Sequence, residues 1–156
     1  MNLAPAGLQH GRFCLVNGIA AYLADNEKTA LYESIFRREQ KITVALSDLR
    51  SKSLGKFVSQ KSLRLVDVRG LEQEYPYLHS LRIELTQAFA QECSDAGFHG
   101  VLYSSAQHSQ NECVCLFELG AKKLALTETW NLVKPGTNII LDCVADAAER
   151  SGVVIT

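Results

Sequence analysis

The sequence predicts an α+β fold, and three observations support this prediction. Its 156 residues match the size of one domain, so residues 1–156 are expected to form a single domain. Hydrophobic residues make up 47% and charged residues 21%, which is an ordinary globular composition. Strand-like segments follow one another in runs, in contrast to the strict strand–helix alternation of a doubly wound sheet.

The first helix is expected directly after a short buried strand. Residues 18–24 are almost all apolar and are therefore expected to form that strand. Asp25 or Asn26 offers a side-chain oxygen to the helix N-terminus, and the helix is expected over residues 27–39. Further strands are expected at residues 42–46, 55–59 and 63–68.

The clearest helical pattern begins at Pro76. Apolar residues then follow the 3.6-residue period of a helix, at Leu78, Leu81, Leu85, Ala88 and Phe89. Gly97 is suited to ending this helix. The later elements are expected as a strand at 100–103, a polar loop at 104–112, strands at 113–118 and 123–130, a helix around 140–148 and a strand at 153–155.

Composition and motifs exclude several classes of protein. With 16 Lys and Arg against 17 Asp and Glu, nothing favours direct binding of nucleic acid or of an anionic membrane. No apolar window reaches the roughly 18–20 residues of a membrane helix, and no secretory signal is recognised, so a cytoplasmic location is expected. Glycine-rich nucleotide motifs and metal-ligand histidine spacings are absent from the sequence, so no metal is expected. The five cysteines are expected to be buried free thiols.

Two local patterns in the first quarter of the chain carry candidate chemistry. Arg12 follows Gly11 and enters an apolar segment, where a guanidinium suits phosphate or carboxylate; a surface arginine before a strand is the alternative. Tyr22 interrupts an aliphatic strand, and Glu33 borders the apolar side of the next helix. A carboxylate at such a border is open to a perturbed pKa, while a solvated glutamate is the alternative.

The third pattern is the polar end of a late strand. Ser104 and Ser105 follow Tyr103, and Asn111 precedes the next strand. Loops at strand ends commonly hold binding residues, while an ordinary polar hairpin loop is the alternative. The residues of this loop alone do not choose between the two interpretations.

Taken together, these motifs resemble the RES-domain family, which is named for an arginine, a glutamate and a serine. The matching segments are Gly11-Arg12-Phe13, Tyr22-Leu23-Ala24, Ala30-Leu31-Tyr32-Glu33, and Tyr103-Ser104-Ser105-Ala106 with Asn111. Their order along the chain makes the combined match more specific than any single motif. The resemblance covers about residues 11–132, and Ser105 is preferred over Ser104 as the family's serine.

The resemblance implies an ADP-ribosyltransferase-like fold with a split mixed sheet, and an enzyme that degrades NAD. Family members cleave the bond between nicotinamide and ribose by phosphorolysis or hydrolysis, so NAD is the expected substrate and inorganic phosphate an optional co-substrate. The implied catalytic residues are Glu33, Arg12 and Ser105, and Tyr22, Asn111 and Ser104 are expected to contact the bound NAD. An ionised glutamate suits this chemistry, because cleavage builds positive charge on the ribose ring.

The resemblance also implies a toxin that an inhibitory antitoxin or immunity protein neutralises, and it allows a homodimer. Two alternatives remain at this point: an ADP-ribosyltransferase acting on a macromolecule, and a catalytically degenerate RES-like binding module. If the chain is an NAD-degrading enzyme, we expect Arg12, Tyr22, Glu33 and Ser105 to line one concave cleft.

Overall fold

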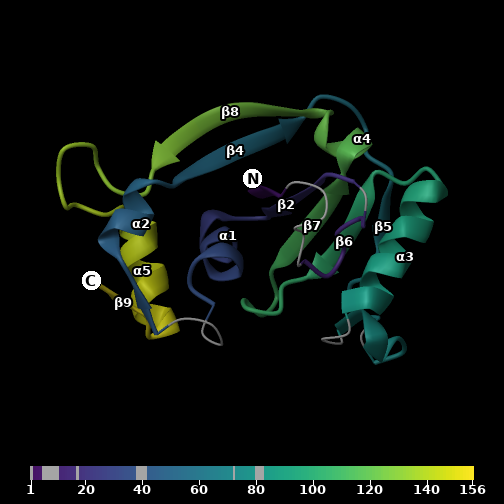
Figure 1. The fold of residues 1–156 in the computed structure, drawn as a ribbon, viewed down its shortest axis with the longest axis horizontal. Coiled ribbons are helices and arrows are strands. Elements are labelled where there is room, and N and C mark those ends of the chain that lie inside the picture. The colour runs from purple at the N-terminus through teal and green to yellow at the C-terminus, as the bar shows by residue number, and fades with distance from the viewer. Residues whose placement is uncertain (1, 5–10, 17, 38–41, 72, 80–82) are drawn as a thin grey trace. The chain divides into compact units, whose positions relative to one another are not determined.

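The computed structural model describes residues 2–4, 11–16, 18–37, 42–71, 73–79 and 83–156. Among these residues, helices and strands are both well represented, and the sheets are not built from regular strand–helix alternation, which confirms the α+β class (Figure 1). The chain divides into two compact units. The first comprises residues 1–23, 58–104 and 112–125, and the second comprises residues 24–57, 105–111 and 126–156.

A five-stranded mixed sheet organises the first unit, in the order β1-β2-β7-β6-β5. Its strands are β1 (Asn2–Ala4), β2 (Ala20–Ala24), β5 (Leu65–Asp67), β6 (Gly100–Ser104) and β7 (Glu112–Phe117). β5 and β6 are parallel, whereas β6 and β7 are antiparallel and place Val101 opposite Cys115, both fully buried. This pairing needs glycine at position 100, because a Cβ there would lie 2.3 Å from the carbonyl oxygen of Cys115.

Two helical segments follow β5 where one helix was expected. Pro76–His79 form the 3₁₀ helix η1, and α3 spans Ile83–Asp95 and packs against β6. A 3₁₀ helix has about three residues per turn, so the 3.6-residue period expected from Pro76 onward does not hold within η1. Gly97 ends this region with a φ of 79°, as expected of a helix C-terminus.

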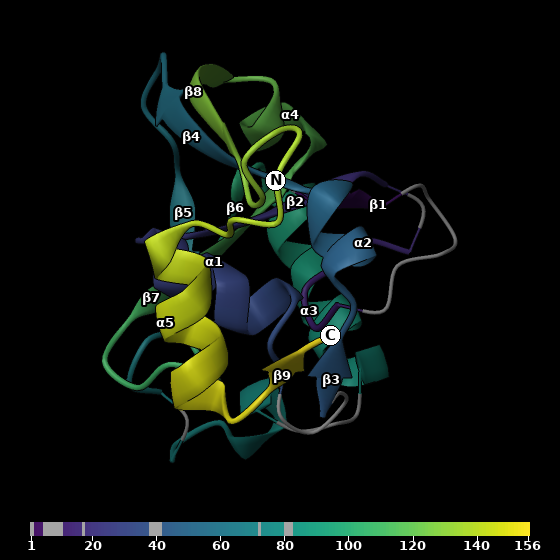
Figure 2. The same ribbon diagram turned by 90° about the vertical axis from the view of Figure 1, so that its left-hand side faces the viewer.

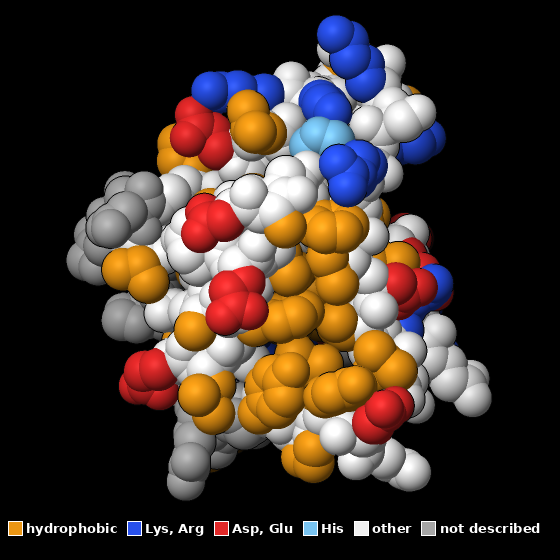
Figure 3. All heavy atoms as spheres, turned by 90° about the vertical axis from the view of Figure 1, so that its right-hand side faces the viewer, with side chains coloured by type: hydrophobic (Ala, Val, Ile, Leu, Met, Phe, Trp, Pro, Cys, Tyr) orange, Lys and Arg blue, Asp and Glu red, His pale blue; other side chains and the backbone are white. Residues whose placement is uncertain are grey.

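The apolar stripe predicted for this helix holds at Phe89, which is half-buried and contacts the Phe13 ring, but it was wrong at Leu85 and Ala88. Leu85 is 45% exposed and Ala88 is exposed, and Figure 3 shows hydrophobic side chains on the surface viewed from the α3 side. The buried face instead carries Thr86, whose hydroxyl donates to the carbonyl of Ile83. Leu81 lies outside the described residues.

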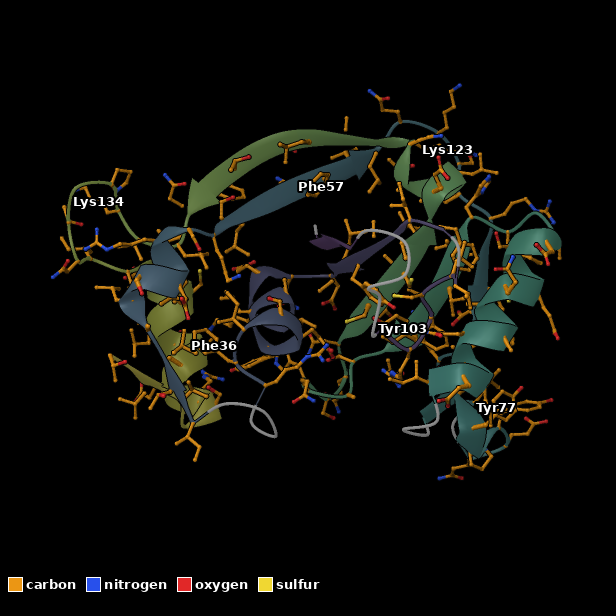
Figure 4. The ribbon with its side chains drawn as sticks, in the orientation of Figure 1. Phe36, Phe57, Tyr77, Tyr103, Lys123 and Lys134 are labelled. Carbon is orange, nitrogen blue, oxygen red and sulfur yellow. The ribbon has the colours of Figure 1, made fainter. Side chains whose placement is uncertain are left out.

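The second unit is built around α1 (Glu27–Ser34) and α5 (Asp142–Ser151), which pack together. Figure 2 shows α5 with the short parallel pair β3 (Thr43–Val44) and β9 (Val154–Ile155) beside it. The unit also contains α2 (Leu46–Arg50). The strands β4 (Ser53–Ser59) and β8 (Leu124–Asn131) pair with each other, and most of their residues belong to this unit. The core of this unit consists of Leu31, Tyr32, Ile35, Phe36, Val44, Leu49, Leu132, Val133, Val144, Ala147, Ala148 and Val153, with Phe36 labelled in Figure 4.

Several element boundaries differ from the sequence-based expectation. The helix predicted over 27–39 ends at Ser34, because the N–H groups of Ile35 and Phe36 both turn back to Leu31 and bury these side chains in the core. Residues 38–41 lie outside the described residues. The strand expected at 42–46 ends at Val44, because Leu46 begins α2, a turn that brings Leu49 into the core.

The strand expected at 113–118 likewise ends before Glu118, which begins the short helix α4 (Glu118–Ala121). Cys113 and Cys115 point to the same buried side of β7, as their alternation predicts. All five cysteines are free, as expected; four of them are buried, whereas Cys143 is half-buried. In the described part of the chain, no helix is long and apolar enough to cross a membrane.

Candidate functional site

The arginine segment, residues 11–14, is held in the first unit by Tyr22. The backbone N–H of Phe13 donates to the Tyr22 hydroxyl at 3.2 Å, and the Cys14 thiol lies 3.1 Å from the same oxygen. The Cys115 thiol donates to the Phe13 carbonyl at 3.2 Å. Gly11 is required here, because a Cβ at this position would lie 2.1 Å from the Tyr22 hydroxyl. The glycine before the arginine is therefore explained by a close approach to the tyrosine.

Arg12 is oriented mainly by aromatic rings. Its guanidinium lies 5.1 Å from the ring centre of Tyr103, on β6, and 5.7 Å from that of Phe13. Tyr103 is labelled in Figure 4. Its Nη1 donates to the carbonyl of Leu78 at 3.4 Å. Among the described residues, no carboxylate pairs with Arg12. Since a guanidinium has five N–H donors, this arrangement leaves donors for an anion such as phosphate.

Tyr22 keeps its proton at all ordinary pH values. Burial raises the pKa of Tyr22 far above its usual value, and the neighbouring Cys115 and Cys14 thiols raise it further. Its hydroxyl is engaged in the arginine segment, so its demonstrated role is to support the backbone next to Arg12. The contact with nicotinamide expected from the family resemblance stays a prediction.

Glu33 and Ser105 are hydrogen-bonded to each other in the second unit. The Ser105 hydroxyl donates to Oε1 of Glu33 at 2.6 Å. The same hydroxyl oxygen accepts the backbone N–H groups of His108 at 3.0 Å and Gln107 at 3.2 Å. A serine hydroxyl has one proton and two lone pairs, so all three are used. Ser105 is thus arranged to orient the carboxylate.

The Glu33 carboxylate is partly accessible. The Glu33 side chain is 20% exposed to solvent, whereas Ser105 is buried. The second oxygen, Oε2, lies 3.9 Å from Nη2 of Arg37, one helical turn further on. Oε1 is therefore held by the Ser105 hydroxyl and, at 3.4 Å, by the backbone N–H of Gln107. Oε2 is only loosely paired and is available to a cationic ligand.

The structure distinguishes Ser105 from Ser104. Ser104 is the last residue of β6 and pairs in register with Glu112, in the first unit. Ser105 begins the serine loop, residues 105–111, in the second unit, and Glu33 is its partner. Sequence-predicted residues are thus brought together in two groups, Glu33 with Ser105, and Tyr22 with the segment that carries Arg12. A cleft shared by all four stays a prediction.

A comparison with protein-family models decides the family. The RES domain model matches residues 1–135, which is most of the chain. The chain belongs to the RES-domain family. The match contains every candidate residue named above and extends beyond the region 11–132 that the motifs covered. Searches of the curated proteins and of the solved structures gave no significant match.

Asn111 of this RES-domain chain is engaged within the second unit. Its Oδ1 accepts from Nδ2 of Asn26 at 2.7 Å, and its Nδ2 donates to the carbonyl of Ser109 at 2.9 Å. Asn26 is also the N-cap of α1, so Asn111 links the end of the serine loop to the start of the helix. Contact between Asn111 and NAD stays a prediction.

The motifs did not point to Thr29 and His108. Oγ1 of Thr29 lies 2.8 Å from Nδ1 of His108, and the His108 ring contacts the Tyr32 ring edge-on at 5.0 Å. A signal for Thr29 exists in the sequence, because Asn26, Thr29 and Glu33 follow the spacing of one helix face. In the described part of the RES-domain chain, no group of three or more His, Cys, Asp or Glu could hold a metal ion.

Proposed function

We propose that this RES-domain protein degrades NAD by cleaving the bond between nicotinamide and ribose. The observation that supports the proposal most is the pairing of Glu33 with Ser105, which the sequence motifs led us to expect as the family's glutamate and serine. The expected acceptor of the ribosyl group is phosphate or water. The products are then nicotinamide with phosphorylated ADP-ribose, or nicotinamide with ADP-ribose.

The bond changes define what the protein must supply. The C–N bond to nicotinamide breaks, and its electron pair neutralises the positively charged pyridinium nitrogen. Positive charge develops on the ribose ring, and an oxygen of phosphate or water then bonds to the same carbon. With water as acceptor, one proton is released to solvent. Nicotinamide is a good leaving group, so no general acid is required.

Glu33 is assigned to stabilise the ribose cation. A carboxylate whose orientation is fixed before the reaction lowers the barrier more than a freely rotating one, because no reorganisation is needed. Ser105 supplies this fixed orientation through the hydrogen bond to Oε1. Arg12 is assigned to bind the pyrophosphate of NAD or the incoming phosphate, and Tyr22 to confine the nicotinamide.

We further propose that the activity makes the protein a toxin, acting in the cytoplasm and held inactive by an antitoxin or immunity protein. Loss of NAD stops central metabolism, so a producing cell needs such an inhibitor. Expression of the chain alone is expected to arrest growth and to lower cellular NAD. Normal growth with abundant protein and unchanged NAD would contradict this proposal.

The decisive experiment is incubation of purified protein with NAD, with and without inorganic phosphate, followed by mass analysis of products. Phosphorylated ADP-ribose identifies phosphorolysis, and ADP-ribose in both samples identifies hydrolysis. Nicotinamide release that requires an added macromolecule, with a matching mass increase on it, supports an ADP-ribosyltransferase instead. NAD binding without any product indicates a degenerate binding module. Glu128→Gln is a matched control, because Glu128 is an exposed carboxylate paired with Lys56 on a strand of the second unit.

A further inference from the structure

The serine loop meets a single face of α1 and its N-cap at three points. Ser105 bonds Glu33, His108 lies against Thr29, and Asn111 bonds Asn26. Positions 26, 29 and 33 are spaced as one helix face, and the loop contacts them in reverse order. The serine loop therefore contacts α1 and its N-cap at both ends of the loop and in its middle.

The direction of each hydrogen bond in this network follows from the backbone. Oδ1 of Asn26 accepts the backbone N–H of Thr29 at 2.9 Å, which fixes the orientation of the Asn26 amide. Its Nδ2 must then be the donor to Oδ1 of Asn111 at 2.7 Å. Nδ2 of Asn111 donates to the Ser109 carbonyl, so the side-chain amides of Asn26 and Asn111 are both oriented consistently.

The hydroxyl of Thr29 determines the tautomer of His108. Thr29 is fully buried, and its Oγ1 donates to Oδ1 of Asn26 at 3.0 Å. A hydroxyl has one proton, so toward Nδ1 of His108, at 2.8 Å, the oxygen of Thr29 accepts. Both contacts are hydrogen bonds only if Nδ1 of His108 carries a proton and donates.

We propose that Thr29 and His108 are positioning residues that hold Ser105 against Glu33. His108 connects the two parts, because its ring bonds Thr29 while its backbone N–H donates to the Ser105 hydroxyl. Displacing His108 removes one of the two donors that direct the Ser105 proton toward Glu33. This inference rests on the proposed function for its effect on catalysis, whereas its effect on the loop is independent of any activity.

The first test uses substitutions at Thr29. Thr29→Val keeps the side-chain shape and removes the hydroxyl, while Thr29→Ser keeps the hydroxyl. In Thr29→Val we expect the amide protons of Gln107 and His108, which donate to Ser105, to exchange with solvent about tenfold faster. Thr29→Ser should exchange like wild type. The measurement is amide hydrogen exchange by NMR on the full chain.

Thr86→Val is the matched control. Thr86 is also fully buried and its hydroxyl also donates one hydrogen bond, to Ile83, but it lies in the first unit. It should leave exchange of the loop amides unchanged. If Thr29→Val does not alter these amides, or Thr86→Val alters them equally, the inference is wrong.

The second test uses His108, which is less buried than Thr29 and serves if Thr29→Val does not fold. His108→Asn retains an N–H donor near the position of Nδ1, and His108→Leu removes it. We expect His108→Leu to lower kcat for NAD cleavage about 10- to 100-fold with little change in KM, and His108→Asn to restore most of kcat. Equal kcat in the two variants would overturn the positioning role. Altered loop amides in a protein without NAD cleavage would retain the positioning network and reject the proposed function.

Discussion

The arginine segment and the serine loop are held by different kinds of interaction. Around Arg12 the contacts are aromatic faces, the half-buried Tyr22, two thiols and a glycine with no room for a side chain. Around Ser105 the contacts are directional hydrogen bonds between small polar groups, with each donor and acceptor assigned. The first region is therefore sensitive to volume, and the second is sensitive to the loss of single polar atoms.

This difference suits the two proposed tasks. Binding an anion tolerates small displacements of a flexible guanidinium, so steric support of the backbone beside Arg12 is sufficient. Stabilising a developing charge requires a carboxylate in one orientation, which hydrogen bonds specify more sharply than packing does. Substitutions that change only polarity should then affect catalysis at Glu33, and substitutions that change only volume should affect stability near Arg12.

The largest effect is expected for Glu33→Gln. The variant keeps the shape and can still accept from Ser105, but it removes the charge that we propose stabilises the ribose cation. The rate of NAD cleavage should fall about 10²–10³-fold, equivalent to ~3–4 kcal/mol, while NAD still binds. Stability should change by under about 1 kcal/mol, because the side chain is partly exposed.

Initial rates measure the loss of NAD cleavage, and calorimetric titration with NAD measures whether binding is retained. Glu128→Gln should match wild type in both measurements. A Glu33→Gln variant that cleaves NAD at the wild-type rate would remove the central residue from the mechanism.

The next largest effect is expected for Gly11→Ala. The new Cβ would lie 2.1 Å from the Tyr22 hydroxyl and 2.5 Å from Cζ, so the segment must shift. Overpacking of this kind costs about 1–3 kcal/mol, and here we expect the upper end, measured by denaturant unfolding. Its cost should largely disappear in a Tyr22→Ala background, since the overlapping atoms are then absent. Equal costs in both backgrounds would reject the steric explanation.

Tyr22→Phe removes one oxygen and should have a smaller effect on stability. The Phe13 N–H loses its acceptor, which costs about 1–2 kcal/mol at neutral pH. Burial raises the pKa of Tyr22 above the unfolded value of 10.0, so its contribution is complete below pH 10.0 and is lost progressively as the pH rises above that value. Phenylalanine does not titrate.

The stability advantage of wild type over Tyr22→Phe should therefore shrink as the pH rises from about 8 to about 11. Denaturant unfolding of both proteins at each pH measures this difference. A constant or growing difference across this range would contradict the assigned burial of the tyrosine hydroxyl.

The sequence was sufficient for features that depend on local patterns. The alternation of side chains along a strand predicted that Cys113 and Cys115 of β7 face the same side. A capping residue before a helical segment predicted that α1 begins at Glu27. The motifs also named Glu33 and Ser105, which the structure joins although 72 positions separate them. For these features the identity of nearby residues carried the information.

Features that depend on distant packing were not predictable in this way. The leucine at position 85 is exposed and the threonine at 86 is buried, so the face that α3 buries is set by what the helix packs against and not by its apolar residues alone. The contact of Thr29 with His108 spans 79 positions, and no pattern along the chain indicates that a loop will return to that helix face. Pairing across such a separation is decided by the fold.

The smallest effect is expected for Arg37→Gln. This variant tests whether the carboxylate of Glu33 depends on its directional hydrogen bonds and not on its ion pair. Nη2 of Arg37 is 3.9 Å from Oε2 of Glu33 and its side chain is 42% exposed, so solvent and salt screen this pair. The rate of NAD cleavage should change by less than about threefold, and the ratio of variant to wild type should approach one as ionic strength increases. Rates at low and high salt measure this. A loss comparable to that of Glu33→Gln would show that Arg37, and not Ser105 alone, fixes the carboxylate, and the contrast between directional and loose contacts at Glu33 would then be wrong.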